Sequence, residues 1–218
     1  MSLTLYAHPF SSYSQKVLIA LYENATPFEW RLLESDEEIL REWKRLWPLA
    51  LMPVLRDGER RLVESSVILE YLQLRYPGPV RLLPEDPLEA LESRFMDRVF
   101  DLHVMGPMQA IVYDFRRPPG QRHPPTVAEA RARLDQVYEW LDGRLADRTW
   151  AAGGAFGLAD CAAAPSLFYA DWAHEMAPRF GNLRAYRARL LERPSFKRAV
   201  DEARPYRKWF PPGAPDRD

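Results

Sequence analysis

Hydroxyl side chains gather just after the first apolar segment, in HPFSSYSQKV at 8–17, where Ser11 precedes a predicted helix. The free N–H groups at a helix N-terminus favour an anion, and a hydroxyl placed there can donate to a thiolate. Lowering a thiol pKa by ~2 units from ~8.5 requires about 2.7 kcal/mol, which these two groups together can supply. The alternative is that Ser11 only caps the helix, which the local sequence alone favours.

A second candidate element is the proline in LMPVL at 51–55. If the Met52–Pro53 bond is cis, the backbone of Met52 is turned outward and can pair with an extended peptide as a strand would. The alternative is an ordinary trans proline at the first residue of a strand.

The third element is Glu64-Ser65, which precedes an apolar helical pattern. We expect Ser65 to be the helix N-cap, with exposed amides that bind a carboxylate, while Glu64 pairs with an ammonium group. The pair therefore suits the head group of an amino acid. Read alone, the dipeptide is explained as well by simple capping.

The first third of the chain reads as a compact α/β layer. Alternating apolar residues predict strands at 3–7 and 28–32, and an Asp57-Gly58 turn predicts a hairpin between apolar runs at 52–55 and 62–63. The helical periods lie at 11–23, 36–46 and 65–76. The order βαβ-α-ββα is typical of thioredoxin-like domains.

The rest of the chain reads as helical. A Pro-rich stretch at 77–88 separates the two parts, and a long helix over 86–115 is expected to bend at Pro107. Further helices are predicted at 126–146, 158–174, 182–192 and 194–204. We expect the tail to fray. The alternative is a lid formed by Tyr206, Trp209 and Phe210.

Composition excludes several classes of function. The net charge is -1, with 30 basic and 31 acidic residues, so no field of one sign attracts nucleic acid or an anionic membrane. Cys161 is the one cysteine, which fits a reducing compartment. No signal peptide and no run of 18 apolar residues is evident, so we expect a cytoplasmic protein that needs no membrane partner. The four histidines lack ligand spacing, so no metal site is expected.

In order and spacing, these elements resemble the cytosolic glutathione S-transferases over the whole chain. That family has Ser, Tyr or Cys after the first strand, a cis-proline before the third, and Glu/Gln-Ser at the third helix. Ser11 falls on the catalytic serine of the serine-type theta, phi and zeta classes, as in a bacterial member. The resemblance implies glutathione as co-substrate, Ser11 as thiol activator, Met52 as cysteinyl partner beside Pro53, and Glu64 and Ser65 as γ-glutamyl binders.

The resemblance extends to the second half through Gly157-Leu158-Ala159-Asp160, similar to the family's capping box, and through Arg193-Pro194-Ser195-Phe196. It implies a thioredoxin-like domain at 1–78, a linker at 79–86, and an all-helical domain at 87–218 that contributes the hydrophobic substrate site. It also implies a homodimer. The residues expected at the hydrophobic site are Phe10, Met105, Met108 and Val112.

The sequence departs from the family pattern at several places that bear on folding or function, among them Trp47 and Ala50, which replace the common Asn and Gly around the loop before Pro53. Gly157 stands where Ser or Thr usually opens the capping box. Leu51 stands where many members have Lys or Gln against the glycyl carboxylate, so Lys44 or Arg45 is the candidate substitute. Tyr13 replaces the cysteine of the zeta class, which weakens a maleylacetoacetate isomerase interpretation.

The function expected from these observations is conjugation of the glutathione thiolate to small hydrophobic electrophiles. Two alternatives stay open. One is a glutathione-dependent isomerase or dehalogenase, which uses the same thiolate. The other is a non-catalytic module that keeps the fold for protein contacts, and Leu51 is the feature in its favour. The sequence does not identify the electrophile.

Overall fold

A four-stranded mixed sheet forms the first part of the molecule in the computed structural model, which describes residues 3–218. The strand order is β2-β1-β3-β4; β1 runs parallel to β2 and antiparallel to β3, and Leu5 lies opposite both Trp30 and Leu55. The strands are β1 (Leu3–Ala7), β2 (Phe28–Leu32), β3 (Val54–Asp57) and β4 (Arg60–Leu62).

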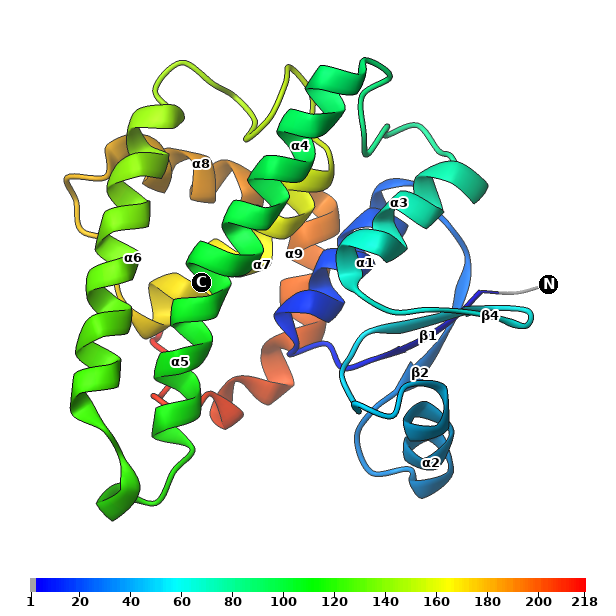
Figure 1. Cartoon of the computed structure of the whole chain (residues 1–218), viewed down its shortest axis with the longest axis horizontal. Coiled ribbons are helices and arrows are strands. Elements are labelled where there is room, and N and C mark those ends of the chain that lie inside the picture. Colours follow the sequence, from blue (N-terminus) through cyan, green and yellow to red (C-terminus); the bar gives the residue numbers. More distant parts are fainter. Residues whose placement is uncertain (1–2) are drawn as a thin grey trace.

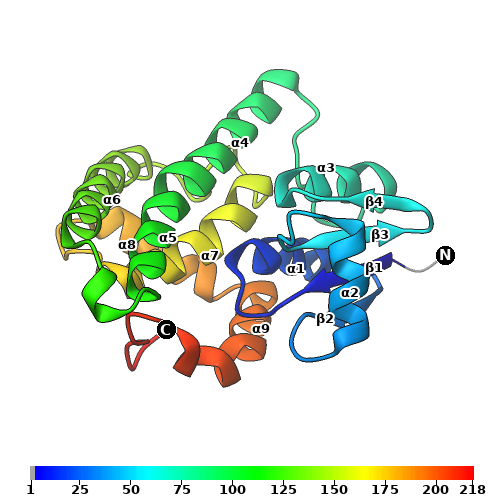
Figure 2. The ribbon, with the colours of Figure 1, turned by 60° about the horizontal axis from the view of Figure 1, so that its bottom comes forward.

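Helices cover both faces of this sheet (Figures 1 and 2). Successive strand residues point to opposite faces, so Leu5 packs with α1 and α3 while Tyr6 packs with Trp43 of α2. The helices are α1 (Ser12–Glu23), α2 (Glu37–Leu46) and α3 (Ser65–Arg75). The sequence predicted all seven elements, and this unit is a thioredoxin-like domain.

The second part is all-helical and surrounds α7, whose residues are all buried. Its helices are α4 (Pro87–Val99), η1 (Phe100–Met105), α5 (Gly106–Phe115), η2 (Pro119–Gln121), α6 (Pro124–Arg144), α7 (Leu158–Ala173), α8 (Gly181–Leu191), α9 (Pro194–Ala203) and η3 (Arg204–Trp209). Both α7 and α9 pack against α1, which joins the two parts (Figure 1). The exact boundaries at 79–86 stay a prediction. Within residues 3–218, no helix is long and apolar enough to cross a membrane.

The long helix predicted over 86–115 is interrupted. A π-helical turn, η1, separates α4 from α5 and ends just before Gly106-Pro107. Pro107 has no N–H, and in a regular α-helix its ring would clash with the carbonyl of the residue four positions earlier, which is His103 inside the π-helical turn. Pro107 therefore disturbs the turn that precedes it, and a regular helix, α5, resumes at Gly106.

The capping box at α7 explains the glycine that departs from the family pattern. The carboxylate of Asp160 accepts from the Gly157 N–H at 2.9 Å, the Ala151 N–H at 2.9 Å and the Tyr186 hydroxyl at 2.5 Å. A Cβ at Gly157 would lie 2.7 Å from the carbonyl oxygen of Leu82. Because backbone approaches that closely, glycine is the residue that fits at this position.

The tail is ordered, so the prediction that it frays is wrong. Phe210 is buried and packs against Tyr169 and Trp172 of α7. The carboxylate of Asp218 pairs with Arg207 at 2.9 Å, and Arg217 pairs with Asp171. These anchors turn the segment after η3 back toward α7 (Figure 2).

Candidate active site

A cavity of about 970 Å³ lies between the carboxyl ends of β1 and β2 and the helical domain. The wall from the thioredoxin-like domain consists of His8, Phe10, Ser11, Ser12, Tyr13, Leu33, Glu34, Trp47, Ala50, Leu51, Met52, Pro53, Glu64 and Ser65. The facing wall consists of Arg98, Asp101, Leu102, Met108, Gln109, Val112, Tyr113, Arg116, Tyr169, Trp209, Phe210 and Pro211. Ligand pockets commonly lie at such domain junctions.

The β1–α1 turn presents Ser11 to this cavity. Ser11 is the N-cap of α1; its N–H donates to the His8 carbonyl at 3.0 Å, and its Oγ accepts from the Ser14 N–H at 3.3 Å. Behind the turn, the buried amide of Gln15 donates to the Pro9 carbonyl at 2.9 Å and to the Tyr169 hydroxyl at 3.0 Å. The turn is therefore held from both domains.

Capping does not consume the hydrogen of the Ser11 hydroxyl. A serine hydroxyl has one hydrogen to donate and two lone pairs, and the contact with Ser14 uses a lone pair. Among the hydrogen bonds within residues 3–218, none has this hydroxyl as donor. The two interpretations of Ser11, helix cap and donor to a ligand, are thus compatible.

The Met52–Pro53 peptide bond is cis, as the peptide-pairing interpretation required. The indole N–H of Trp43 donates to the carbonyl of Leu51 at 3.0 Å, which fixes the residue before Met52. Met52 lines the cavity, and no hydrogen bond found among the described residues uses its backbone N–H or carbonyl. Both groups remain available to an extended ligand.

The start of α3 differs from expectation by one residue. Glu64 is the N-cap, without a side-chain capping bond, and Ser65 is the first helical residue. Glu64 has φ 66°, a left-handed conformation that costs a non-glycine residue of order 1–3 kcal/mol and is concentrated at functional sites. Since the first N–H groups of a helix lack intrahelical partners, the α3 terminus at Ser65 offers donors to an anion.

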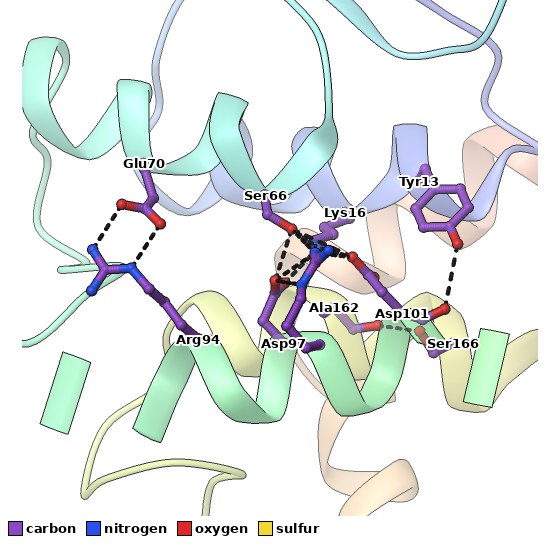
Figure 3. A network of polar contacts seen from close by, with 10 residues as sticks. Tyr13, Lys16, Ser66, Glu70, Arg94, Asp97, Asp101, Ala162 and Ser166 are labelled. Atoms are coloured by element: carbon purple, nitrogen blue, oxygen red, sulfur yellow. Dashed lines mark hydrogen bonds and ion pairs between the residues drawn. The ribbon is translucent and has the colours of Figure 1, made fainter. Parts of the chain in front are cut away.

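Behind this terminus lies a buried ion network that joins α1, α3 and α4 (Figure 3). The ammonium group of Lys16, 1% exposed, contacts Asp97 at 2.5 Å, Asp101 at 2.9 Å and the Ser66 hydroxyl at 2.9 Å. Arg98 pairs with the same carboxylates at 2.9 and 2.6 Å. Burial raises the pKa of Asp101, and the neighbouring Lys16 opposes that rise. The network fixes Arg98 and Asp101 in the helical wall.

Tyr13 brings a second hydroxyl to the cavity. Its hydroxyl donates to the carbonyl of Asp101 at 3.5 Å (Figure 3). Burial, followed by the Asp101 carboxylate, raises the pKa of Tyr13 above its ordinary value. Tyr13 is therefore a neutral donor at physiological pH.

The structure brings most of the predicted site residues together. Those that line the cavity are Phe10, Ser11, Met52, Pro53, Glu64, Ser65, Met108 and Val112. Met105 does not line the cavity; it is 1% exposed and packs in the core. Lys44 and Arg45 are exposed on α2 and do not line the cavity either.

Several residues that line the cavity are not among those that the sequence predicts for the site. Arg98 and Asp101 had a readable signal, since charged residues at 97, 98 and 101 fall within one helical turn or so. For Trp209 and Phe210, the sequence suggests a role at the cavity only through the lid that is the alternative to a frayed tail. Tyr113, Gln109 and Arg116 carried no local signal, because their place depends on how α5 packs against the first domain.

Comparison with known proteins agrees with this geometry. A thioredoxin-like domain followed by an all-helical domain, with a cavity between them that contains a cis-proline turn and two helix N-termini, defines the fold of glutathione transferases. Residues 5–80 match the model of the glutathione S-transferase N-terminal domain, and residues 124–189 match that of the C-terminal domain. The chain belongs to the glutathione S-transferase family.

Individual relatives cover nearly the whole chain. A probable maleylacetoacetate isomerase of Vibrio cholerae is 30% identical over 94% of this chain and 98% of its own length. Glutathione S-transferase GstB of Escherichia coli is 30% identical over 91% of this chain and 97% of its own. Among solved structures, a glutathione S-transferase of Methylobacillus flagellatus with glutathione bound is 26% identical, with TM-score 0.81 over 91% of this chain and 98% of its own.

Proposed function

We propose that this protein is a serine-type glutathione transferase that conjugates the glutathione thiolate to small hydrophobic electrophiles. One observation carries the proposal. The Ser11 hydroxyl, at the N-terminus of α1, shares a cavity with the Met52–Pro53 turn and with the N-terminus of α3. These are the groups that a γ-glutamyl-cysteinyl thiol needs.

The tripeptide would lie across the ends of the strands. Its γ-glutamyl carboxylate would accept from the amides at Ser65, with its ammonium group near Glu64. The cysteinyl backbone would pair with Met52, and the thiol would then face Ser11. Arg98, fixed by the ion network, adds a cation on the γ-glutamyl side.

The reaction would proceed by thiolate attack. The Ser11 hydroxyl and the α1 terminus stabilise the sulfur anion, so the thiol loses its proton to solvent at neutral pH. The sulfur forms a bond to the electrophilic carbon, and the leaving group, such as chloride, departs with its electron pair. Phe10, Met108 and Val112 provide the apolar surface that holds the electrophile, and the flexible methionine suits varied shapes.

The test has a binding part and a kinetic part. We expect calorimetry to detect glutathione binding at millimolar concentration or below, and absence of binding would reject the proposal. Ser11→Ala should retain glutathione affinity within about threefold while conjugation of a chlorinated aromatic falls at least about tenfold. Ser11→Thr, which keeps the hydroxyl, should recover much of the rate, and Ser35→Ala, an exposed serine outside the cavity, is the matched control.

We also propose that the protein is a cytoplasmic homodimer that acts in detoxification. Support for the dimer comes from large apolar side chains exposed on α3 and α4, which a second copy would cover. They are Val67, Leu74, Leu88, Leu91 and Phe95. Sedimentation equilibrium should give twice the 25.4 kDa chain mass, whereas a monomer at micromolar concentration would reject the dimer.

A second candidate is glutathione-dependent isomerisation, favoured by the similarity to the Vibrio cholerae protein named as a probable maleylacetoacetate isomerase. In that reaction the thiolate adds to a double bond and leaves again after rotation, so no conjugate accumulates. A cis–trans assay with catalytic glutathione separates the two. Isomerisation without consumption of glutathione would favour this candidate.

A further inference from the structure

The end of the cavity opposite the γ-glutamyl site differs from that site in its charges. In the binding mode proposed above, on which this inference rests, the γ-glutamyl group lies at Ser65, beyond β4, and the cysteinyl group lies at Met52. The strand order β2-β1-β3-β4 then directs the glycyl residue toward the β2 edge. Antiparallel pairing with Met52 leads to the same place, since it directs the ligand's C-terminal end toward Leu51 and Ala50.

The walls at this end lack a cation that could bind a carboxylate. They include Leu33, Glu34, Trp47, Ala50 and Leu51. Leu51 is 56% exposed and has no donor in its side chain, and Glu34 carries a negative charge. Within residues 3–218, the Lys and Arg side chains that line the cavity are Arg98 and Arg116, both from the helical domain.

Neither arginine lies at the end of the cavity where the glycyl residue would bind. Arg98 is held by Asp97 and Asp101 beside α3, at the γ-glutamyl side of the cavity. Arg116 follows the last turn of α5, in the wall that faces the electrophile. The carboxylate of glutathione would therefore meet Glu34 without a compensating positive charge.

His8 adds no charge at this end. Its Nδ1 accepts from the Phe10 N–H at 3.1 Å, so the neutral ring carries its hydrogen on Nε2. Burial lowers the pKa of His8, although Glu34 opposes that shift. Tyr206 packs edge-on against the ring at 4.5 Å, and Trp209 stacks on it at 5.8 Å. The imidazole is consequently neutral at physiological pH.

We propose that this site accepts a γ-glutamyl-cysteinyl-glycine thiol whose C-terminal carboxylate is blocked as an amide, in preference to glutathione itself. An amide carries no charge to repel Glu34, and its N–H can donate to the Glu34 carboxylate. An amide with an amine at its far end gains a second favourable interaction with the same carboxylate. The thiol chemistry at Ser11 is unchanged.

A charge series of three ligands tests this directly by calorimetry at low ionic strength. The ligands are glutathione, its glycyl amide and its glycyl 2-aminoethyl amide. We expect the amide to bind about threefold tighter than glutathione and the aminoethyl amide about tenfold tighter, with both differences shrinking in high salt. Glutathione binding as tightly as the amide, or tighter, would overturn the inference and leave the proposed function intact. Failure of all three to bind would overturn both.

Two substitutions locate the effect. Glu34→Gln should raise glutathione affinity about threefold and abolish the extra affinity of the aminoethyl amide. Leu51→Lys should reverse the order, with glutathione the tightest ligand. Glu59→Gln removes the same charge from an exposed residue outside the cavity and should leave the series unchanged. A Glu34→Gln series identical to that of the unmodified protein would contradict the role of Glu34.

Discussion

The two walls of the cavity are built in different ways. The thioredoxin-like wall takes its functional groups from three local structures: the Ser11 cap, the cis turn at Pro53 and the start of α3 at Ser65. The helical wall combines α4, α5, α7 and a tail more than 90 residues beyond α5. The wall proposed to bind the thiol is thus fixed by short chain segments, whereas the wall proposed to face the electrophile depends on tertiary packing.

The largest expected effect comes from cutting the connection between the walls. Lys16→Met removes the buried cation that joins α1 to Asp97 of α4 and to Asp101 of η1. Because the two carboxylates stay buried, we expect a loss of about 3–5 kcal/mol in unfolding free energy, measured by urea denaturation. The exposed Lys197→Met should change stability by less than about 0.5 kcal/mol. A loss below about 1 kcal/mol for Lys16→Met would show that the walls do not depend on this network.

The next effect concerns the core of the helical domain alone and depends on pH. Burial raises the pKa of Asp160 from an ordinary value of 3.8 to about 6. The folded protein therefore holds this proton more tightly than the unfolded chain, so the stabilisation is complete below about pH 4 and is lost as pH rises through about 6.

Asp160→Asn tests this, since the variant cannot titrate at this position. The variant should be less stable than the unmodified protein at about pH 4. This difference in unfolding free energy should shrink by up to about 3 kcal/mol as the pH rises to about 7, because only the unmodified protein loses stability. The exposed Asp147→Asn should show no such trend. A deficit that stays constant over this range would contradict the raised pKa.

The smallest effect should separate the walls functionally. Tyr113 is 54% exposed on α5 and lines the cavity on the helical side. Tyr113→Ala should raise KM for the electrophile about threefold and leave KM for glutathione within about twofold. Trp140→Ala, which removes an aromatic that is 43% exposed on α6 and lies outside the cavity, is the control. Equal changes in both KM values would contradict the proposal that the helical wall contacts the electrophile and not glutathione.

The contrast between a wall built from short segments and a wall built by tertiary packing also explains which features the sequence could predict. Strands and helices of the thioredoxin-like domain follow from alternation, helical period and turn residues, which are local signals. Even there, Ser65 was placed as the N-cap because the left-handed backbone of Glu64 cannot be read from the sequence. The side chains of Lys44 and Arg45 were expected at the site, but only the packing of α2 decides which of its faces is covered.

In the helical wall, local signals were insufficient. Met105 and Met108 look equivalent on one continuous helix, but a π-helical turn ends at Met105, and of the two only Met108 lines the cavity. The tail looked free because termini commonly fray, yet Phe210 fits among the aromatics of α7. Neither outcome is encoded within a short segment.

The central claim is that Ser11 lowers the pKa of a bound thiol, and an ultraviolet titration of the thiolate in the glutathione complex tests it most directly. For the unmodified protein we expect a bound-thiol pKa about 2 units below the free value near ~8.5. In Ser11→Ala, at saturating glutathione, the pKa should return to within about half a unit of the free value. An equally low pKa in the variant would contradict the account and leave the helix terminus, or Tyr13, as the group that stabilises the thiolate.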